Sequence, residues 1–146
     1  MRHLVICVLL LSIPLFAWPQ AAEEKIDPID PDEPFIKSIY FGGGSYFVNG
    51  EQIELLQEFI SEIPDINQYV ISIHSHTDNI GGERYNKWLS QMRSESVIYE
   101  LILQSIPPDN IMIRDFGQNN PVFDNQTWIG KQQNRRVDIL FEKIVF

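Results

Sequence analysis

Residues 69–93 read YVISIHSHTDNIGGERYNKWLSQMR, and this stretch decides the fold. Residues 69–74 form a short run rich in residues that favour β-strands. The polar, glycine-containing segment 77–82 predicts a loop, and the residues after it predict a helix over about 83–104 that stops before Pro107 and Pro108. A strand, a glycine-containing loop and a long helix in this order indicate an α/β layer arrangement.

The residues before this stretch predict a further strand and helix. Residues 39–41 start a strand, and the three glycines at 42–44 are expected to bend it. Asn49 is suited to cap a helix, in which hydrophobic residues recur at helical spacing between Ile53 and Ile63. Pro64 is expected to end that helix.

The residues after it complete the expected sheet. Residues 111–116 and 136–142 predict two strands, with Val137, Ile139 and Phe141 on one face of the second. The polar, turn-rich segment 117–134 between them predicts a loop. The order β-α-β-α-β-loop-β predicts a two-layer α/β (α+β) sandwich with the helices on one side of a mixed sheet.

The beginning of the chain has a different composition. Residues 1–22 combine a short basic start, an apolar run and small residues, which is the pattern of a cleaved secretory signal peptide; an uncleaved anchor is the alternative. Residues 23–34 hold three prolines and six acids and predict an acidic linker. The compact domain is expected over residues 35–146. The single cysteine, Cys7, lies in the apolar run, so no disulfide is expected.

Charge is spread unevenly along the 146 residues. The formal net charge is −9, which argues against nucleic acid as a partner. Residues 22–73 hold eleven acidic and two basic residues, whereas residues 74–146 hold nine acidic and eight basic ones. A binding site in the second half can therefore accept an anionic group despite the acidic total.

One helix face carries the candidate binding residues. Asn86, Ser90 and Arg93 fall at i, i+4 and i+7 and form one row, so Asn86 and Ser90 are expected to hydrogen-bond to the loop before the helix. If the loop folds back, Asp78 and Arg93 form a cleft that suits a zwitterion, because a carboxylate accepts from an ammonium and a guanidinium grips a carboxylate. The alternative is a structural salt bridge, in which Asp78 caps the turn and pairs with Arg93.

Three ordered motifs carry a resemblance to a known family. They are His76-Thr77-Asp78 with Gly81 and Asn86-x-x-Leu89-Ser90-x-x-Arg93; Gly117-Gln118-x-x-Pro121-Val122; and Asn134-Arg135-Arg136-Val137. Together they resemble the OmpA-like peptidoglycan-binding domain, shared by outer-membrane protein A, the Pal lipoprotein and MotB stator proteins. The resemblance covers about residues 39–141. The family often has glycine where this chain has Ser75, and alanine where it has Ser94.

The resemblance implies a ligand and a set of binding residues. The family binds the peptide stem of peptidoglycan without a covalent bond, chiefly through diaminopimelate. Asp78 and Arg93 match the residues that hold the ammonium and the carboxylate of that group. Asn86 matches the asparagine that supports the loop, Arg135 matches an arginine beside the site, and Thr77 belongs to the same motif.

Other candidate sites have simpler explanations. His74 and His76 share a strand face, but no second cluster of metal ligands accompanies them, so no metal is expected. The serine and histidine residues lack a catalytic arrangement, so no enzyme and no cofactor are expected. Tyr85, Trp88 and Met92 are expected to lie in the core. Trp128 is expected to pack under its loop, although it could also stack on a sugar or cover the cleft.

The sequence therefore predicts an exported, non-catalytic module that binds peptidoglycan in the periplasm or at the outer membrane. Envelope proteins are further possible partners, and no membrane-spanning segment is expected in the mature chain. The Asp78→Asn and Arg93→Ala variants are expected to lose wall binding and keep their fold. The alternative is a periplasmic protein-interaction module of the same fold that uses the linker and first helix. A wall hydrolase would need a nucleophile or zinc set that the sequence does not offer.

Overall fold

The computed structural model describes residues 33–144. The predicted signal peptide and all but the last two residues of the predicted linker lie outside this range. One mixed sheet has the strand order β1-β4-β2-β3, in which β2 and β3 pair in parallel and the other two neighbouring pairs are antiparallel. Its strands are β1 (Phe35–Tyr40), β2 (Tyr69–His76), β3 (Ile111–Gly117) and β4 (Arg136–Lys143).

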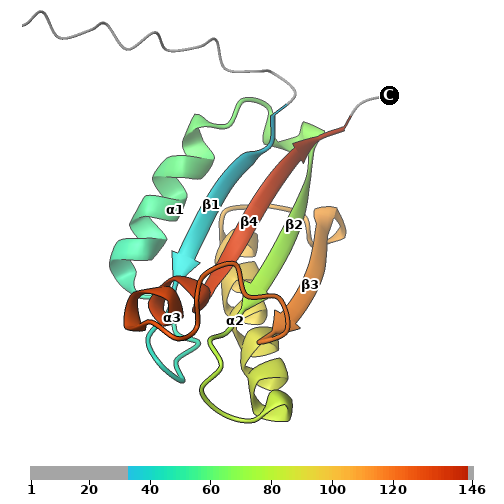
Figure 1. Cartoon of the computed structure of the whole chain (residues 1–146). Helices are drawn as coiled ribbons and strands as arrows, with labels where there is room; N and C mark the ends of the chain where they lie inside the picture. The colour runs from blue at the N-terminus through green and yellow to red at the C-terminus, as the bar shows by residue number, and fades with distance from the viewer. Residues whose placement is uncertain (1–32, 145–146) are drawn as a thin grey trace, which may run out of the picture.

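Two long helices, α1 (Gly50–Glu62) and α2 (Glu83–Leu103), lie on one side of the sheet (Figure 1). Asn49 caps α1 as predicted, because its side chain accepts a hydrogen bond from the amide of Gln52. Two short 3₁₀ turns, Ile66–Gln68 and Pro108–Asn110, precede β2 and β3. Within residues 33–144, none of the helices is both long and apolar enough to span a membrane. The predicted α/β sandwich is confirmed.

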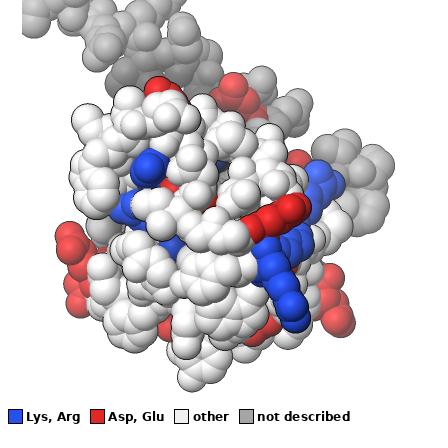
Figure 2. Space-filling model, turned by 60° about the horizontal axis from the view of Figure 1, so that its bottom comes forward, with Lys and Arg blue, Asp and Glu red and all other residues white. Residues whose placement is uncertain are grey.

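One end of the sheet gathers the loops that matter for function. The strands β1, β2 and β3 end there and β4 begins there, at the lower end in Figure 1. The segments that join β1 to α1 and β2 to α2 meet at this end. Figure 2 brings it forward and shows a mostly uncharged surface, with acidic and basic atoms side by side in a hollow.

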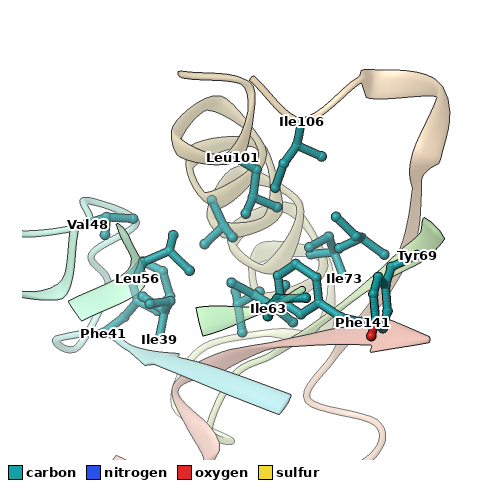
Figure 3. Close-up of a cluster of buried hydrophobic side chains, with 14 residues drawn as sticks. Ile39, Phe41, Val48, Leu56, Ile63, Tyr69, Ile73, Leu101, Ile106 and Phe141 are labelled. Atoms are coloured by element: carbon teal, nitrogen blue, oxygen red, sulfur yellow. The ribbon is translucent and has the colours of Figure 1, made fainter. Parts of the chain in front are cut away.

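The hydrophobic core fills the space between the helices and the sheet (Figure 3). Val137, Ile139 and Phe141 are fully buried on one face of β4, as their alternation predicts. Burial of a large aliphatic side chain contributes about 1.5–3 kcal/mol. Leu56 of α1 and Leu101 of α2 contribute to the same cluster. The core therefore fixes both helices against the sheet and, with them, the loops at the site end.

The segment 117–134 was predicted as a loop, and this is wrong for its last part, which forms α3 (Trp128–Asn134). The helix is only seven residues long and lacks a hydrophobic repeat, so periodicity could not reveal it. Two side chains hold it in place. Thr127 accepts a hydrogen bond from the amide of Gly130, and the buried Asn134 binds the backbone of Val122 and Phe123.

The side of α2 that packs on the sheet also differs from the prediction. Tyr85 and Trp88 were expected in the core, but both are exposed to nearly half their surface. The buried residues recur at helical spacing, and at the site end most of them are polar. They are Asn86, Leu89, Ser90, Arg93, Ser94, Val97 and Leu101. A search for hydrophobic residues therefore identifies the wrong face of this helix near its start.

Candidate functional site

A hollow of about 180 Å³ lies at the end of the sheet where the loops meet. Two positive side chains and one negative side chain line it, together with glycines and a few apolar groups. Two guanidinium groups and one carboxylate leave it with a net charge of +1. Its lining residues are Gly43, Gly44, Asp78, Ile80, Gly81, Tyr85, Leu89, Arg93 and Arg135.

Asp78 supplies the negative charge just after β2 ends. Its carboxylate accepts a hydrogen bond from the amide of Ile80 at 3.1 Å, which holds the turn. The other oxygen pairs with Nη1 of Arg135 at 3.0 Å, and both side chains are buried. Asp78 thus caps the turn, as the structural alternative predicts, but its partner is Arg135 and not Arg93.

Arg93 is fully buried and ties three segments together. Its Nε donates to the carbonyl of Ser45 at 2.9 Å, Nη1 to that of His76 at 2.9 Å, and Nη2 to that of Gly42 at 3.2 Å. The guanidinium carbon also lies 4.9 Å from the ring centre of Phe41. Arg93 therefore fixes the loop after β1 to the end of β2 and places a positive charge at the hollow.

The pKa of Arg93 is lowered to about 10, mainly because burial disfavours the charged form, while the nearby carboxylate of Asp78 acts in the opposite direction. A pKa of about 10 still leaves this guanidinium protonated at neutral pH. The positive charge at the hollow is therefore permanent under physiological conditions.

Arg135 is the second positive group and is the C-cap residue directly after α3. Its Nε donates to the carbonyl of Phe41 at 3.1 Å, and its guanidinium lies 5.5 Å from the ring centre of Trp128. In the part of the chain that the structure describes, no hydrogen bond occupies its Nη2. The resemblance alone pointed to this residue, because its spacing in the sequence gives no sign that it pairs with Asp78.

Asn86 supports the loop, as predicted. Its side-chain amide donates to the carbonyl of Asp78 at 3.3 Å and to the side chain of Gln118 at 2.6 Å. Thr77 is buried and ties the ends of β2 and β3 together through its backbone amide, which donates to the carbonyl of Gly117. Ser90 does not reach the loop, since its hydroxyl donates to the carbonyl of Lys87 within the helix. Thr77 and Asn86 thus shape the hollow without lining it.

Glycines form part of the wall, which their positions in the sequence did not reveal. Gly44 and Gly81 adopt positive φ angles of 68° and 104°, a region that other residues rarely occupy. A Cβ atom at Gly81 would lie 2.9 Å from the ring of Tyr85. The run of three glycines was the available signal, but it was interpreted only as a bend.

The two histidines of β2 lie on the other face of the sheet and form no metal site. His76 stacks on Phe116 at 5.1 Å between ring centres, and its Nε2 lies 3.8 Å from Asp138, whose carboxylate binds Nε of Arg136. Among residues 33–144, no group of three or more His, Cys, Asp or Glu side chains could hold a metal ion. Burial lowers the pKa of His76 to about 4, and the positive charge of Arg136 acts in the same direction.

This pKa predicts a pH dependence of stability. The unfolded chain binds a proton at His76 near pH 6.5, whereas the folded chain binds it only near pH 4. The contribution of the neutral His76 side chain to the free energy of unfolding is therefore complete above pH 6.5 and is lost as the pH falls towards 4. The loss amounts to about 2.5 kcal/mol at pH 4.5. Urea unfolding of wild type and His76→Gln at pH 7 and pH 4.5 is expected to show the smaller decline for the variant. Equal declines would contradict the prediction.

Comparison with known proteins adds independent information. Residues 40–135 match the model of the OmpA family. Outer-membrane lipoprotein YfiB from Pseudomonas aeruginosa is 33% identical over 102 residues, which are 70% of this chain and 61% of YfiB. Outer membrane protein A from Bordetella avium is 32% identical over 120 residues, which are 82% of this chain and 62% of the relative. The crystal structure of the peptidoglycan-associated lipoprotein from Burkholderia pseudomallei aligns with a TM-score of 0.66 at 30% identity, covering 72% of this chain and 89% of that one.

The chain spans only 61% and 62% of the length of the two sequence relatives. Their names, and that of the structural relative, are names of outer-membrane proteins or lipoproteins, and none of the three is named as an enzyme. This confirms the expected location in the bacterial envelope.

Proposed function

The chain belongs to the OmpA family, and on this premise we propose that it binds peptidoglycan without cleaving it. The finer part of the proposal is that the hollow receives the diaminopimelate residue of the peptide stem. A single observation carries it: Asp78, Arg93 and Arg135 line one small hollow of mixed charge at the loop end of the sheet. The lipoprotein from Burkholderia pseudomallei that shares the fold is named as peptidoglycan-associated.

The charges of the hollow suit an amino-acid group. Asp78 offers a carboxylate to an ammonium, and Arg135 offers Nη2 to a carboxylate. Arg93 adds a fixed positive charge, while its three carbonyl partners keep the hollow in shape. Thr77 and Asn86 act behind these residues by holding the loop that carries Asp78. We therefore assign direct contact to Asp78, Arg93 and Arg135 and support to the other two.

The experiment is co-sedimentation of the purified protein with isolated sacculi in the presence of small competitors. Free meso-diaminopimelate is expected to release the protein, whereas lysine, which lacks the second carboxylate, is expected to release far less. The supernatant is expected to contain no muropeptides, because binding leaves the wall intact. Absence of sedimentation would refute wall binding, and equal competition by lysine would refute the diaminopimelate assignment alone.

The acidic side of α1 is not expected to take part. Glu54, Glu58 and Glu62 are exposed on this helix and do not line the hollow. The triple change to Gln is therefore expected to leave the amount of protein bound to sacculi within about twofold of wild type, as for other exposed side chains away from a binding site. A large loss of binding would instead favour the alternative, in which α1 is an interaction surface for another protein.

A further inference from the structure

A row of exposed aromatic side chains begins at the hollow and continues along α2 and the neighbouring loop between β1 and α1. We call it the aromatic strip; the exposed fractions of its members lie between 42% and 74%. An exposed apolar patch of this kind marks a binding surface more often than an accident of packing. The strip consists of Tyr46, Phe47, Tyr85, Trp88 and Tyr99.

The strip is continuous. Tyr85 lines the hollow, and its ring centre lies 5.7 Å from that of Trp88. The ring of Tyr46 follows at 6.1 Å from Trp88, in an edge-to-face arrangement. Tyr46 then lines a groove of about 400 Å³ between its loop and α2. A ligand that occupies the hollow can thus extend over Tyr85 and Trp88 into this groove.

The chemistry of the groove favours a neutral, hydroxyl-rich ligand. Its walls carry two carboxylates, Glu95 and Glu100, and the hydroxyls of Ser96 and Tyr99, but its lining residues include no lysine or arginine. Carboxylates accept hydrogen bonds from hydroxyl groups and repel anions. Aromatic faces pack against the C–H faces of pyranose rings. This combination of groups suits a sugar chain.

The distance between hollow and groove adds a further argument, which rests on the proposed function. A peptidoglycan stem is attached to a sugar of the glycan strand through a few residues. An extended chain spans about 3.3–3.6 Å per residue, so that sugar lies roughly 10 Å from a stem residue held in the hollow. The ring of Trp88 lies 5.7 Å from that of Tyr85, which lines the hollow, and the ring of Tyr46 lies 6.1 Å from that of Trp88, so the strip begins within this reach. We propose that the aromatic strip binds the glycan of the same peptidoglycan whose stem occupies the hollow.

The test compares three ligands on four proteins by calorimetric titration. The ligands are an intact disaccharide muropeptide, the free stem peptide and peptide-free glycan strands. The proteins are wild type and the variants Trp88→Ala, Tyr46→Ala and Trp128→Ala. Trp128 is the matched control, because it is also exposed and lies near the hollow against Arg135, but on the α3 side.

The measured quantity is the ratio of the affinities for the muropeptide and for the free stem. Trp88→Ala and Tyr46→Ala are expected to lower this ratio about two- to tenfold, which corresponds to about 0.5–1.4 kcal/mol for the loss of one aromatic contact. Trp128→Ala is expected to leave the ratio unchanged, whatever it does to stem binding. Peptide-free glycan strands are expected to bind wild type weakly and the Trp88 variant not at all. Circular dichroism establishes that each variant is folded.

The outcomes separate this proposal from the proposed function. Stem binding with an unchanged ratio in Trp88→Ala and Tyr46→Ala would overturn the glycan assignment and leave the stem site in place. A lower ratio in Trp128→Ala would overturn the assignment of the glycan to the aromatic strip and would place the glycan on the α3 side of the hollow. A wild-type dimer that Trp88→Ala dissociates would overturn it in favour of a second copy of this chain. Glycan binding that requires Trp88, without any stem binding, would support the strip and refute the stem site.

Discussion

Replacing Asp78 by Asn is expected to reduce the affinity of the protein for sacculi and for free stem peptide about a hundredfold. The change removes the only carboxylate among the residues that line the hollow. A hydrogen bond to a charged group contributes about 1.5–3 kcal/mol, and its loss corresponds to ten- to a hundredfold in affinity or slightly more. The single side-chain oxygen of Asn can still accept from the amide of Ile80 and hold the turn, although its NH2 group cannot accept from Arg135, so the fold is expected to persist.

Asp109→Asn is the matched control for this experiment. Asp109 is exposed in the turn before β3, at the opposite end of the sheet, and the change alters the net charge by the same amount. Binding of this control is expected to equal that of wild type. If Asp78→Asn bound sacculi as well as Asp109→Asn does, the hollow would not be the binding site.

Replacing Arg93 by Ala is expected to cause a large loss of stability. The side chain is fully buried, and the change removes the donor from the buried carbonyl of His76 and the part-buried carbonyl of Ser45, whereas the carbonyl of Gly42 keeps a hydrogen bond from the amide of Ser45. An unsatisfied buried carbonyl costs about 1–3 kcal/mol and the deleted side chain leaves a cavity, so the expected loss is about 3–5 kcal/mol. In urea unfolding this corresponds to a decrease of the midpoint by about 2 M. The burial of Arg93 thus argues against the expectation from the sequence that this variant keeps its fold.

Two further variants make the Arg93 experiment decisive. Arg84→Ala removes an exposed arginine of the same helix and is expected to change stability by less than about 0.5 kcal/mol. Arg93→Lys keeps the positive charge, but a single ammonium cannot reproduce the planar fork that serves three carbonyls. It is expected to fall between wild type and Arg93→Ala in stability. Equal midpoints for Arg93→Ala and Arg84→Ala would show that the three carbonyls do not depend on Arg93.

The sequence predicted those helices and strands in which hydrophobic residues recur at regular spacing. The alternation of Val137, Ile139 and Phe141 and the capping residue Asn49 correspond to local rules, and the structure confirms both. The sequence also placed Asn86 and Arg93 in one row of the helix that follows the loop, and both lie on its buried face. These features depend on neighbours a few residues apart, which a single sequence reveals.

The partner of Asp78 could not be predicted from spacing. Arg135 lies 57 residues further along the chain and reaches Asp78 only because β4 begins where β2 ends. The carbonyls that hold Arg93 belong to backbone groups, which carry no sequence signal. The exposed position of Trp88 was missed for a related reason, since the buried face of α2 is polar near the hollow.

The points at which the described chain enters and leaves the sheet have a mechanical consequence. The described chain enters the sheet at Phe35 and leaves it after Lys143, both at the end away from the hollow (Figure 1). The two ends of the sheet lie about 20 Å apart, which is the length of the six residues of β1. A pull between the entry point and a ligand in the hollow therefore acts along the strands. The hydrogen bonds between β1 and β4 then resist this force in shear, which loads all of them together, and they do not break one after another.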